Sequence, residues 1–258
     1  MTRAAPSEQP GEAPQDQSRE RYMTVLEHLE ELRFRLFISA VFVIIGLGVS
    51  FYFGGDIIKF LKKPAEARGR SELDLQFIEP FELFVTYFRV SLLGGLVLGM
   101  PMIVYQGLRF VSPGLNPNER RWLYATVFGA TVLFLGGVAF AYYIALPPAL
   151  DFLLDFGGGE IAKADIRVSS YVDFVTRLLF WTGVSFQTPL IVMYLSRFGI
   201  VSAGQLLRWW RFAIVAAFVI AAIVTPTIDP VTQSLVAGPI IVLYFLGIVL
   251  AVLVRPRR

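Results

Sequence analysis

Six long runs without a charged residue restrict the fold of this chain more than any other feature. A helix needs roughly 20 apolar residues to cross the ~30 Å hydrocarbon core of a bilayer. Because that core offers the backbone no hydrogen-bond partner, such runs are expected to be helices, whereas a β-barrel would need shorter segments of alternating polarity. The runs are Leu36–Phe53, Val90–Leu108, Trp122–Leu150, Leu178–Ser196, Phe212–Ile228 and Pro230–Val254.

The runs predict an all-α polytopic membrane protein with six transmembrane helices. We place its transmembrane domain at residues 21–258, and we expect residues 1–20, rich in Pro, Gln, Glu and Ser, to form a disordered cytoplasmic tail. No cleavable signal peptide is expected, because the first run is too long and lies too far from the start of the chain. The spans are expected at about residues 34–53, 84–110, 122–149, 172–196, 211–225 and 230–254.

The fifth span is expected to be short. Thr225-Pro226 should end its helix, because proline disfavours helical backbone in the residue before it. Phe212–Val224 is then about 20 Å long, which is too short for a bilayer of ordinary thickness. This leaves two alternatives, a re-entrant segment or a short span that thins the membrane locally. The sixth span begins at Pro230, so both of the last spans are short or bounded by proline.

The arginines favour the short span, since basic residues prefer the cytoplasmic side of a membrane. If every run spans, most of the 23 basic residues lie on one side, and a re-entrant fifth segment would move the C-terminal arginines to the other. We therefore expect six crossings with the N and C termini both in the cytoplasm. The residues on the expected cytoplasmic side are Arg3, Arg19, Arg21, Arg33, Arg35, Arg109, Arg120, Arg121, Arg197, Arg208, Arg211, Arg255, Arg257 and Arg258.

Several classes of active site are missing from the sequence. The chain has no cysteine and a single histidine, His28, which excludes disulfides and multi-histidine metal sites. There is no H-E-x-x-H motif and no Gly-rich phosphate loop, and the stretch Gly183–Gln187 lacks the last glycine of a nucleophile elbow. We expect no cofactor, no metal, no nucleic-acid partner and no enzyme activity. An intramembrane hydrolase with unusual residues stays as an alternative.

The first candidate site is the acidic segment just before the first span. Glu27, Glu30 and Glu31 lie on the polar side of a predicted helix whose other side is leucine-rich. One interpretation is a solvated lead-in whose carboxylates favour a helix N-terminus. The other is an acidic site for a cationic partner, because carboxylates at a membrane rim can form bidentate hydrogen bonds with guanidinium groups.

Other polar residues have two interpretations each. Glu119 is either a helix-capping residue or a second carboxylate that faces the same cytoplasmic pocket as Glu31. Gln187, in the middle of the fourth span, has a structural or a functional role. Arg89 and Arg177 are expected to extend outward to the interface. Asp229 is most simply the N-cap of the sixth span.

The stretch His28-Leu29-Glu30-Glu31-Leu32-Arg33 resembles the H-L-x-E-L-R motif of the TatC family, the six-span receptors of twin-arginine protein translocation. The resemblance covers roughly residues 23–254, and its strength lies in several weak motifs that follow one another in the same order. These motifs are Ile78–Phe81, Pro101 with Tyr105-Gln106, Phe110–Leu115 with Glu119–Arg121, Phe140 with Tyr142-Tyr143 and Pro147, Phe186-Gln187 with Pro189, and Thr225-Pro226 with Asp229 and Gln233.

The resemblance implies that the chain binds signal peptides with two adjacent arginines, through the cytoplasmic carboxylates of Glu31 and Glu119. It further implies that Arg33 and Arg121 hold the loops in register, and it places His28 and Glu30 in the same signal-peptide-binding site. A second group of residues is implied to contact partner helices. It comprises Gln187, where some relatives carry glutamate, together with Phe186, Pro189, Asp229 and Gln233.

The resemblance also implies where and with what the chain works. The family acts in the bacterial cytoplasmic (inner) membrane as a multi-pass protein, with single-span TatA/TatB-type subunits, in receptor complexes that self-associate. The proton-motive force drives its transport of folded proteins, so no nucleotide site is expected. The alternative drawn from the residues alone is a secondary transporter or channel for a small solute, but such a protein prefers buried charges along several spans, and here the span centres are nearly bare apart from Gln187.

Overall fold

A computed structural model describes residues 25–66, 76, 78–111, 120–155, 167–197, 199–225 and 230–253. The predicted tail of residues 1–20, Glu119 and Asp229 lie outside the described residues, and so does the side chain of Arg121. The described helices are α1 (Val25–Tyr52), α2 (Gly54–Glu66), α3 (Glu82–Val111), α4 (Arg120–Phe140), the π-helical turn η2 (Ala141–Ala145), α5 (Leu146–Asp155), α6 (Val168–Ser185), α7 (Thr188–Arg197), α8 (Ala203–Arg208), α9 (Trp210–Val224) and α10 (Pro230–Leu253).

Five helical stretches of the described chain are long and apolar enough to cross a membrane, and a sixth apolar helix, α9, is shorter. The prediction of an all-helical polytopic membrane protein is therefore confirmed. The 15 residues of α9 measure about 22 Å along the helix axis, less than the ~30 Å of a bilayer core. The long stretches are Leu26–Tyr52, Glu82–Phe110, Tyr124–Leu153, Val168–Arg197 and Thr232–Leu253.

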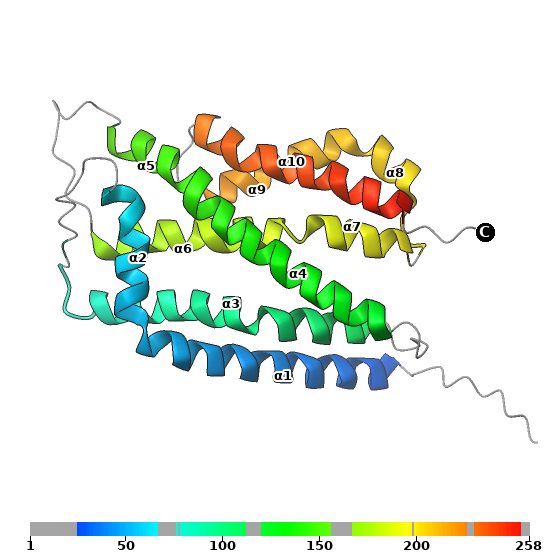
Figure 1. The fold of residues 1–258 in the computed structure, drawn as a ribbon, viewed down its shortest axis with the longest axis horizontal. Coiled ribbons are helices and arrows are strands. Elements are labelled where there is room, and N and C mark those ends of the chain that lie inside the picture. Colours follow the sequence, from blue (N-terminus) through cyan, green and yellow to red (C-terminus); the bar gives the residue numbers. More distant parts are fainter. Residues whose placement is uncertain are drawn as a thin grey trace, which may run out of the picture.

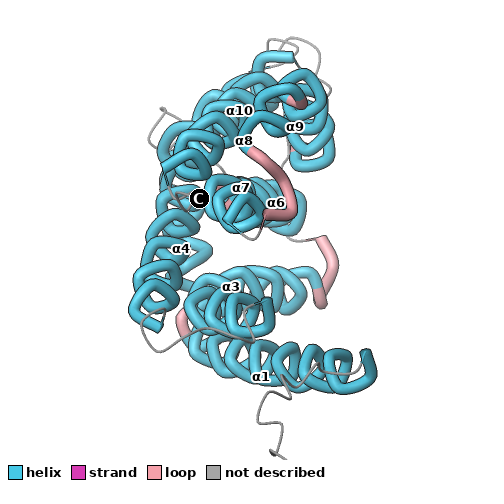
Figure 2. Tube along the Cα trace, turned by 90° about the vertical axis from the view of Figure 1, so that its right-hand side faces the viewer, coloured by secondary structure: helices cyan, strands magenta, loops and turns pink. Residues whose placement is uncertain are grey.

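The long helices pack mostly against their neighbours in sequence, as Figures 1 and 2 show. Helices α1 and α3 form one edge of the bundle, α10 with α9 forms the other, and α6 with α7 lies between them (Figure 2). Helix α4 crosses α3 and α6 diagonally (Figure 1). The described start of α1 and the end of α10 lie at the same end of the bundle, which agrees with the predicted even number of crossings.

Glycines allow α1 and α3 to approach closely. A Cβ atom added to Gly95 of α3 would lie only 2.7 Å from the backbone oxygen of Val43 and from the backbone nitrogen of Leu47 in α1. Gly99, one helical turn further along, faces Val43 as well. Small residues four apart are typical of helix pairs in membranes, where backbone packing takes the place of the hydrophobic effect. This seam places the N-terminal end of α1 beside the C-terminal end of α3.

The predicted fourth span is a broken helix. Helix α6 ends at Ser185 and α7 begins at Thr188, with Phe186 and Gln187 in a turn between them. The break has a covalent cause, because Pro189 has no backbone N–H to donate and its ring excludes the carbonyl of the preceding turn. Gln187 N–H bonds to the carbonyl of Val184 at 2.9 Å, three residues back instead of four. The polar side chain of Gln187 therefore projects from the break between α6 and α7.

Helix α2 lies across the end of the bundle opposite the described start of α1 (Figure 1). Two buried tyrosines hold it there: the hydroxyl of Tyr142 donates to the carbonyl of Phe60 and that of Tyr171 to the carbonyl of Leu61, each at 2.7 Å. Phe60 lies four residues before Pro64, which has no backbone N–H, so the carbonyl of Phe60 lacks its usual donor within α2. Helix α2 is therefore attached to both η2 and α6.

Candidate functional site

The first candidate site lies where the N-terminal part of α1 meets the C-terminal part of α3. His28, Glu31 and Arg35 follow one another at spacings of three and four residues, so they share the face of α1 that meets α3. The imidazole of His28 stacks on the ring of Phe110 in α3, with ring centroids 4.3 Å apart and planes inclined by 17°. The conspicuous H-x-x-E spacing therefore has a geometric basis in the α1–α3 seam.

Glu31 is mostly buried and is held by an arginine of its own helix. One carboxylate oxygen, Oε1, accepts hydrogen bonds from Nε of Arg35 at 3.0 Å and from its terminal nitrogen. The side chains of Arg35 and Glu31 are only 13% and 19% exposed. The guanidinium of Arg35 also reaches Oε1 of Gln106 in α3, at 3.4 Å. Arg35 thereby fixes the rotamer of Glu31 and connects α1 to α3.

The second carboxylate oxygen of Glu31, Oε2, is buried and has no hydrogen-bond partner among the described residues. A buried charged oxygen without a partner carries a large desolvation cost, so such atoms are uncommon in folded proteins. A carboxylate has about four acceptor positions, and here one oxygen is engaged by Arg35 while the other is available for an added donor. A guanidinium or ammonium group is the donor that would bind most strongly.

The remaining predicted residues of this site lie differently. Glu30 and Arg33 are exposed, and they project from the parts of α1 that α3 does not cover. Arg121 belongs to the first turn of α4, which begins at the same end of the bundle (Figure 1). The structure therefore brings His28 and Glu31 together with Arg35, Gln106 and Phe110, and it leaves Glu30 and Arg33 apart from them.

Gln187 is buried, and its amide nitrogen donates to the backbone carbonyl of Ala130 in α4 at 3.0 Å. This bond joins the broken helix to a neighbouring helix of the same chain. Phe186 packs against Gly137 and Phe140 of α4, and Pro189 lies against Gly247 of α10. All three residues thus have intramolecular roles, and their contact with a partner helix stays a prediction.

Gln233 of α10 donates from its amide nitrogen to the backbone carbonyl of Phe218 in α9, at 3.1 Å. The bond joins the helices that precede and follow the connection at residues 225–229. Like Gln187, this amide donates a hydrogen bond to a backbone carbonyl of a neighbouring helix in the same chain. A role in partner contact is again a prediction.

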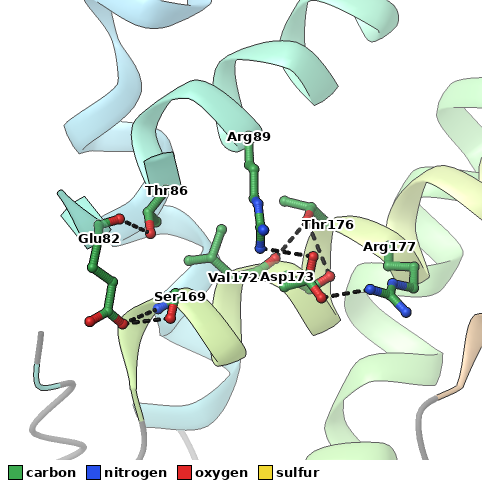
Figure 3. A network of polar contacts seen from close by, with 8 residues as sticks. All are labelled: Glu82, Thr86, Arg89, Ser169, Val172, Asp173, Thr176 and Arg177. Atoms are coloured by element: carbon green, nitrogen blue, oxygen red, sulfur yellow. Dashed lines mark hydrogen bonds and ion pairs between the residues drawn. The ribbon is translucent and has the colours of Figure 1, made fainter. Parts of the chain in front are cut away.

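Figure 3 shows a second polar cluster near the starts of α3 and α6. The carboxylate of Glu82 accepts hydrogen bonds from the backbone nitrogens of Ile78 at 2.8 Å and Ser169 at 3.2 Å, and from the hydroxyl of Ser169. The Glu82 side chain is buried, and both of its carboxylate oxygens accept hydrogen bonds. Because these bonds join the start of α3 to the start of α6, we call the arrangement the α3–α6 clamp.

The same cluster places Arg89 and Arg177 beside one carboxylate, as Figure 3 shows. Arg89 of α3 lies 3.0 Å and Arg177 of α6 lies 2.7 Å from oxygens of Asp173. The sequence-based expectation that both arginines simply extend to the interface is incomplete, because each has a specific partner. Asp173 and Arg177 stand four residues apart in a helix, a signal that sequence reasoning missed. Their partial exposure gives these ion pairs little weight in stability.

The family model of "Sec-independent protein translocase protein (TatC)" matches residues 27–239. A chloroplastic Sec-independent protein translocase protein TATC of Arabidopsis thaliana is 42% identical over 88% of this chain and 66% of its own length. The TatC protein of Synechocystis is 40% identical over 88% of this chain and 87% of its own. The chain spans just under two thirds of the length of the chloroplast relatives from Arabidopsis, pea and rice.

A crystal structure described as the twin arginine translocase receptor TatC has the same fold. It superposes with a TM-score of 0.78 at 37% sequence identity, and the match covers 88% of this chain and 99% of the other. A second crystal structure of such a receptor, in the detergent DDM, gives a TM-score of 0.79.

Proposed function

The chain belongs to the TatC family of Sec-independent protein translocase proteins, and we propose that it is the receptor subunit of a twin-arginine protein translocation complex. In this role it binds twin-arginine signal peptides of folded export substrates. The solved relatives are described as twin-arginine translocase receptors, which supports the proposal. Family membership also favours protein transport over a solute transporter, a channel or an enzyme.

The observation that carries the proposal is the carboxylate of Glu31, with one buried oxygen engaged by Arg35 and the other without a partner among the described residues. A guanidinium from a signal peptide would bind the second oxygen through a charge-assisted hydrogen bond. The second guanidinium would bind Glu119, which lies outside the described residues. His28, stacked on Phe110, and Glu30 would belong to the same binding site, while Arg33 and Arg121 would hold the loops in register.

The orientation follows from the same proposal. The α1–α3 seam carries the site at the end where the described α1 begins and α10 ends, and the sequence predicts that most basic residues lie on that side. We place that end in the cytoplasm and the protein in the bacterial cytoplasmic membrane, with residues 21–258 as a six-span domain. Single-span TatA/TatB-type subunits would contact Gln187, Phe186, Pro189, Asp229 and Gln233, and the proton-motive force would drive transport.

Photo-crosslinking with a probe in the signal peptide, next to its arginine pair, tests the site. With the unaltered chain, an Arg-Arg peptide should label at least tenfold more than a Lys-Lys peptide, because a guanidinium is less strongly hydrated than an ammonium and presents several donors in a fixed plane. Glu31→Gln keeps the side-chain shape and should reduce Arg-Arg labelling about tenfold or more. Glu66→Gln, at an exposed position of α2, removes the same charge elsewhere and serves as the control.

Unchanged Arg-Arg labelling in the Glu31→Gln and Glu119→Gln double variant would contradict the proposal that these two carboxylates bind the signal peptide. Equal labelling by Arg-Arg and Lys-Lys peptides of the unaltered chain would point away from twin-arginine recognition altogether. The two results are distinct, because the first concerns the site and the second the substrate.

A further inference from the structure

An open groove with a volume of about 720 Å³ lies where α8 meets α9. Its lining combines the arginines Arg208 and Arg211 with the aromatic and aliphatic side chains of Trp210, Leu207, Phe212 and Val215. The groove belongs neither to the α1–α3 seam nor to the α3–α6 clamp. Its combination of two cations with apolar side chains is that of a site for a ligand with an anionic head and an apolar body.

The arginines of the groove have no acidic neighbour in sequence. The chain carries no Asp or Glu between Asp173 and Asp229. Both guanidinium groups are exposed, and no ion pair to either is found in the described part of the chain. The guanidinium of Arg211 makes a cation–π contact and lies 5.6 Å from the centre of the Trp210 ring. An anion is therefore the missing partner of this groove.

The helix geometry favours an anion at the same place. Arg211 lies in the first turn of α9, where the partial charge of the helix is positive and a cation is unfavourable. No acidic side chain occupies that turn to offset it. Arg208 lies in the last turn of α8, so the two guanidinium groups approach the groove from successive helices.

The position of the groove along α9 identifies the body of the ligand. Trp209 and Trp210 stand at the start of an apolar helix, which is the place of an aromatic belt at the membrane–water interface. Beyond them, the side chains of Phe212 and Val215 are 74% and 62% exposed, as expected for residues that face lipid tails. A ligand bound here would have its charge beside the arginines and its chains along these side chains.

We propose that this groove binds the phosphate headgroup of an anionic phospholipid, with its acyl chains along Phe212 and Val215. Basic pockets at the ends of transmembrane helices are suited to such headgroups. The bound lipid would stabilise the start of α9, the shortest apolar span, at the interface. The inference requires only that the α8–α9 junction lies at a membrane surface. It is therefore independent of signal-peptide recognition at Glu31.

Native mass spectrometry of the purified full chain in detergent tests the inference, with phosphatidylglycerol or phosphatidylcholine added. The chain should retain phosphatidylglycerol in preference to phosphatidylcholine. Arg208→Gln with Arg211→Gln should weaken retention of the first phosphatidylglycerol roughly ten- to thirtyfold, while Arg208→Lys with Arg211→Lys should keep most of it. Lys59→Gln with Lys63→Gln changes the net charge equally at exposed positions of α2, and it should have no effect.

A photoactivatable phosphatidylglycerol gives a readout that needs no variant, since labelling of the unaltered chain should map to residues 204–215. Labelling only elsewhere would overturn the inference, as would equal retention of both lipids. Unchanged phosphatidylglycerol retention in the double glutamine variant would overturn it too. Displacement of the lipid by millimolar inorganic phosphate would identify a small-anion site instead, and the lipid proposal would then be wrong.

Discussion

At the scale of single residues, the arginine that contacts Glu31 is Arg35, whereas the family motif draws attention to Arg33. The hydrogen bonds of Arg35 to Glu31 and Gln106 make it a positioning residue, because it holds the carboxylate that is proposed to meet the substrate. Arg33, two residues earlier, projects about 200° away around the helix and is exposed. A helical pair four residues apart was visible in the sequence, but which of two nearby arginines would turn inward was not.

Arg35→Met should destabilise the protein by about 2 kcal/mol, because it keeps much of the side-chain volume and leaves the mostly buried Glu31 without its cation. The measurement is the thermal unfolding of the purified chain in detergent. Arg109→Met, at an exposed position in the last turn of α3, is the matched control and should change stability little. Equal unfolding temperatures of the two variants would contradict the positioning role of Arg35.

At the scale of helices, the glycine seam between α1 and α3 determines how precisely the site is assembled. The seam contains Gly46, Gly95 and Gly99, and it lies toward the middle of both helices. Because Glu31 and Gln106 come from different helices, any widening of the seam separates them. The site thus depends on packing several turns away from its own residues.

Gly95→Ala should destabilise the chain by about 1–3 kcal/mol, because the added Cβ meets backbone atoms of α1 that cannot move aside. Gly107→Ala in the same helix has open space around the added atom and should be neutral or slightly stabilising, since alanine favours helix over glycine. Thermal unfolding of the two variants compares them directly. A Gly95→Ala protein as stable as the Gly107→Ala protein would show that the seam is not tight.

The clamp between α3 and α6 gives a second test at this scale. Ser169→Ala removes one hydroxyl donor to the Glu82 carboxylate and should cost about 1–2 kcal/mol of stability. Ser170→Ala, one residue further at an exposed position, is the control. Proteolysis of the folded protein adds a local readout, since loss of the clamp should expose the start of α6 to cleavage. If the two variants unfold and are cleaved alike, the clamp does not hold α6.

At the scale of the whole molecule, the helices are unequal in length around the bundle. Helix α3 has 30 residues, whereas α9 has 15. A lipid bilayer must adapt to both, and a short hydrophobic span is accommodated by local thinning of the bilayer. Since α9 and α10 form one edge of the bundle, the thinning should be confined to that edge (Figure 2).

Spin labels at Phe212 and Ile223, both exposed and near opposite ends of α9, measure this thickness. Phe212 should lie at one membrane interface and Ile223 at the other, so the hydrocarbon layer between the two labels should be about 22 Å thick or less. Labels at Phe34 and Tyr52, exposed positions at the two ends of the expected first span, give the reference on the other edge of the bundle and should report the ordinary ~30 Å. A layer of ordinary thickness at both edges would argue against local thinning.

The sequence by itself determined the class of fold, the number of apolar helices and the unusual length of one of them. These follow from local chemistry: charge-free runs cannot leave the bilayer, and proline ends a helix wherever it stands. The acidic segment with His28 and Glu31 was also visible, because its spacing is that of one helix face. The positions of the basic residues also favoured one orientation, because basic residues near the ends of spans prefer the cytoplasmic side.

Only the tertiary structure decided which polar groups meet. The contacts of Arg35 with Gln106 and of Glu82 with Ser169 depend on how helices distant in the sequence pack. In a bilayer every span is apolar all round, so hydrophobicity does not specify which face meets which neighbour. That choice is made by glycine seams and by a few hydrogen bonds between helices, such as the bond of Gln187 to Ala130.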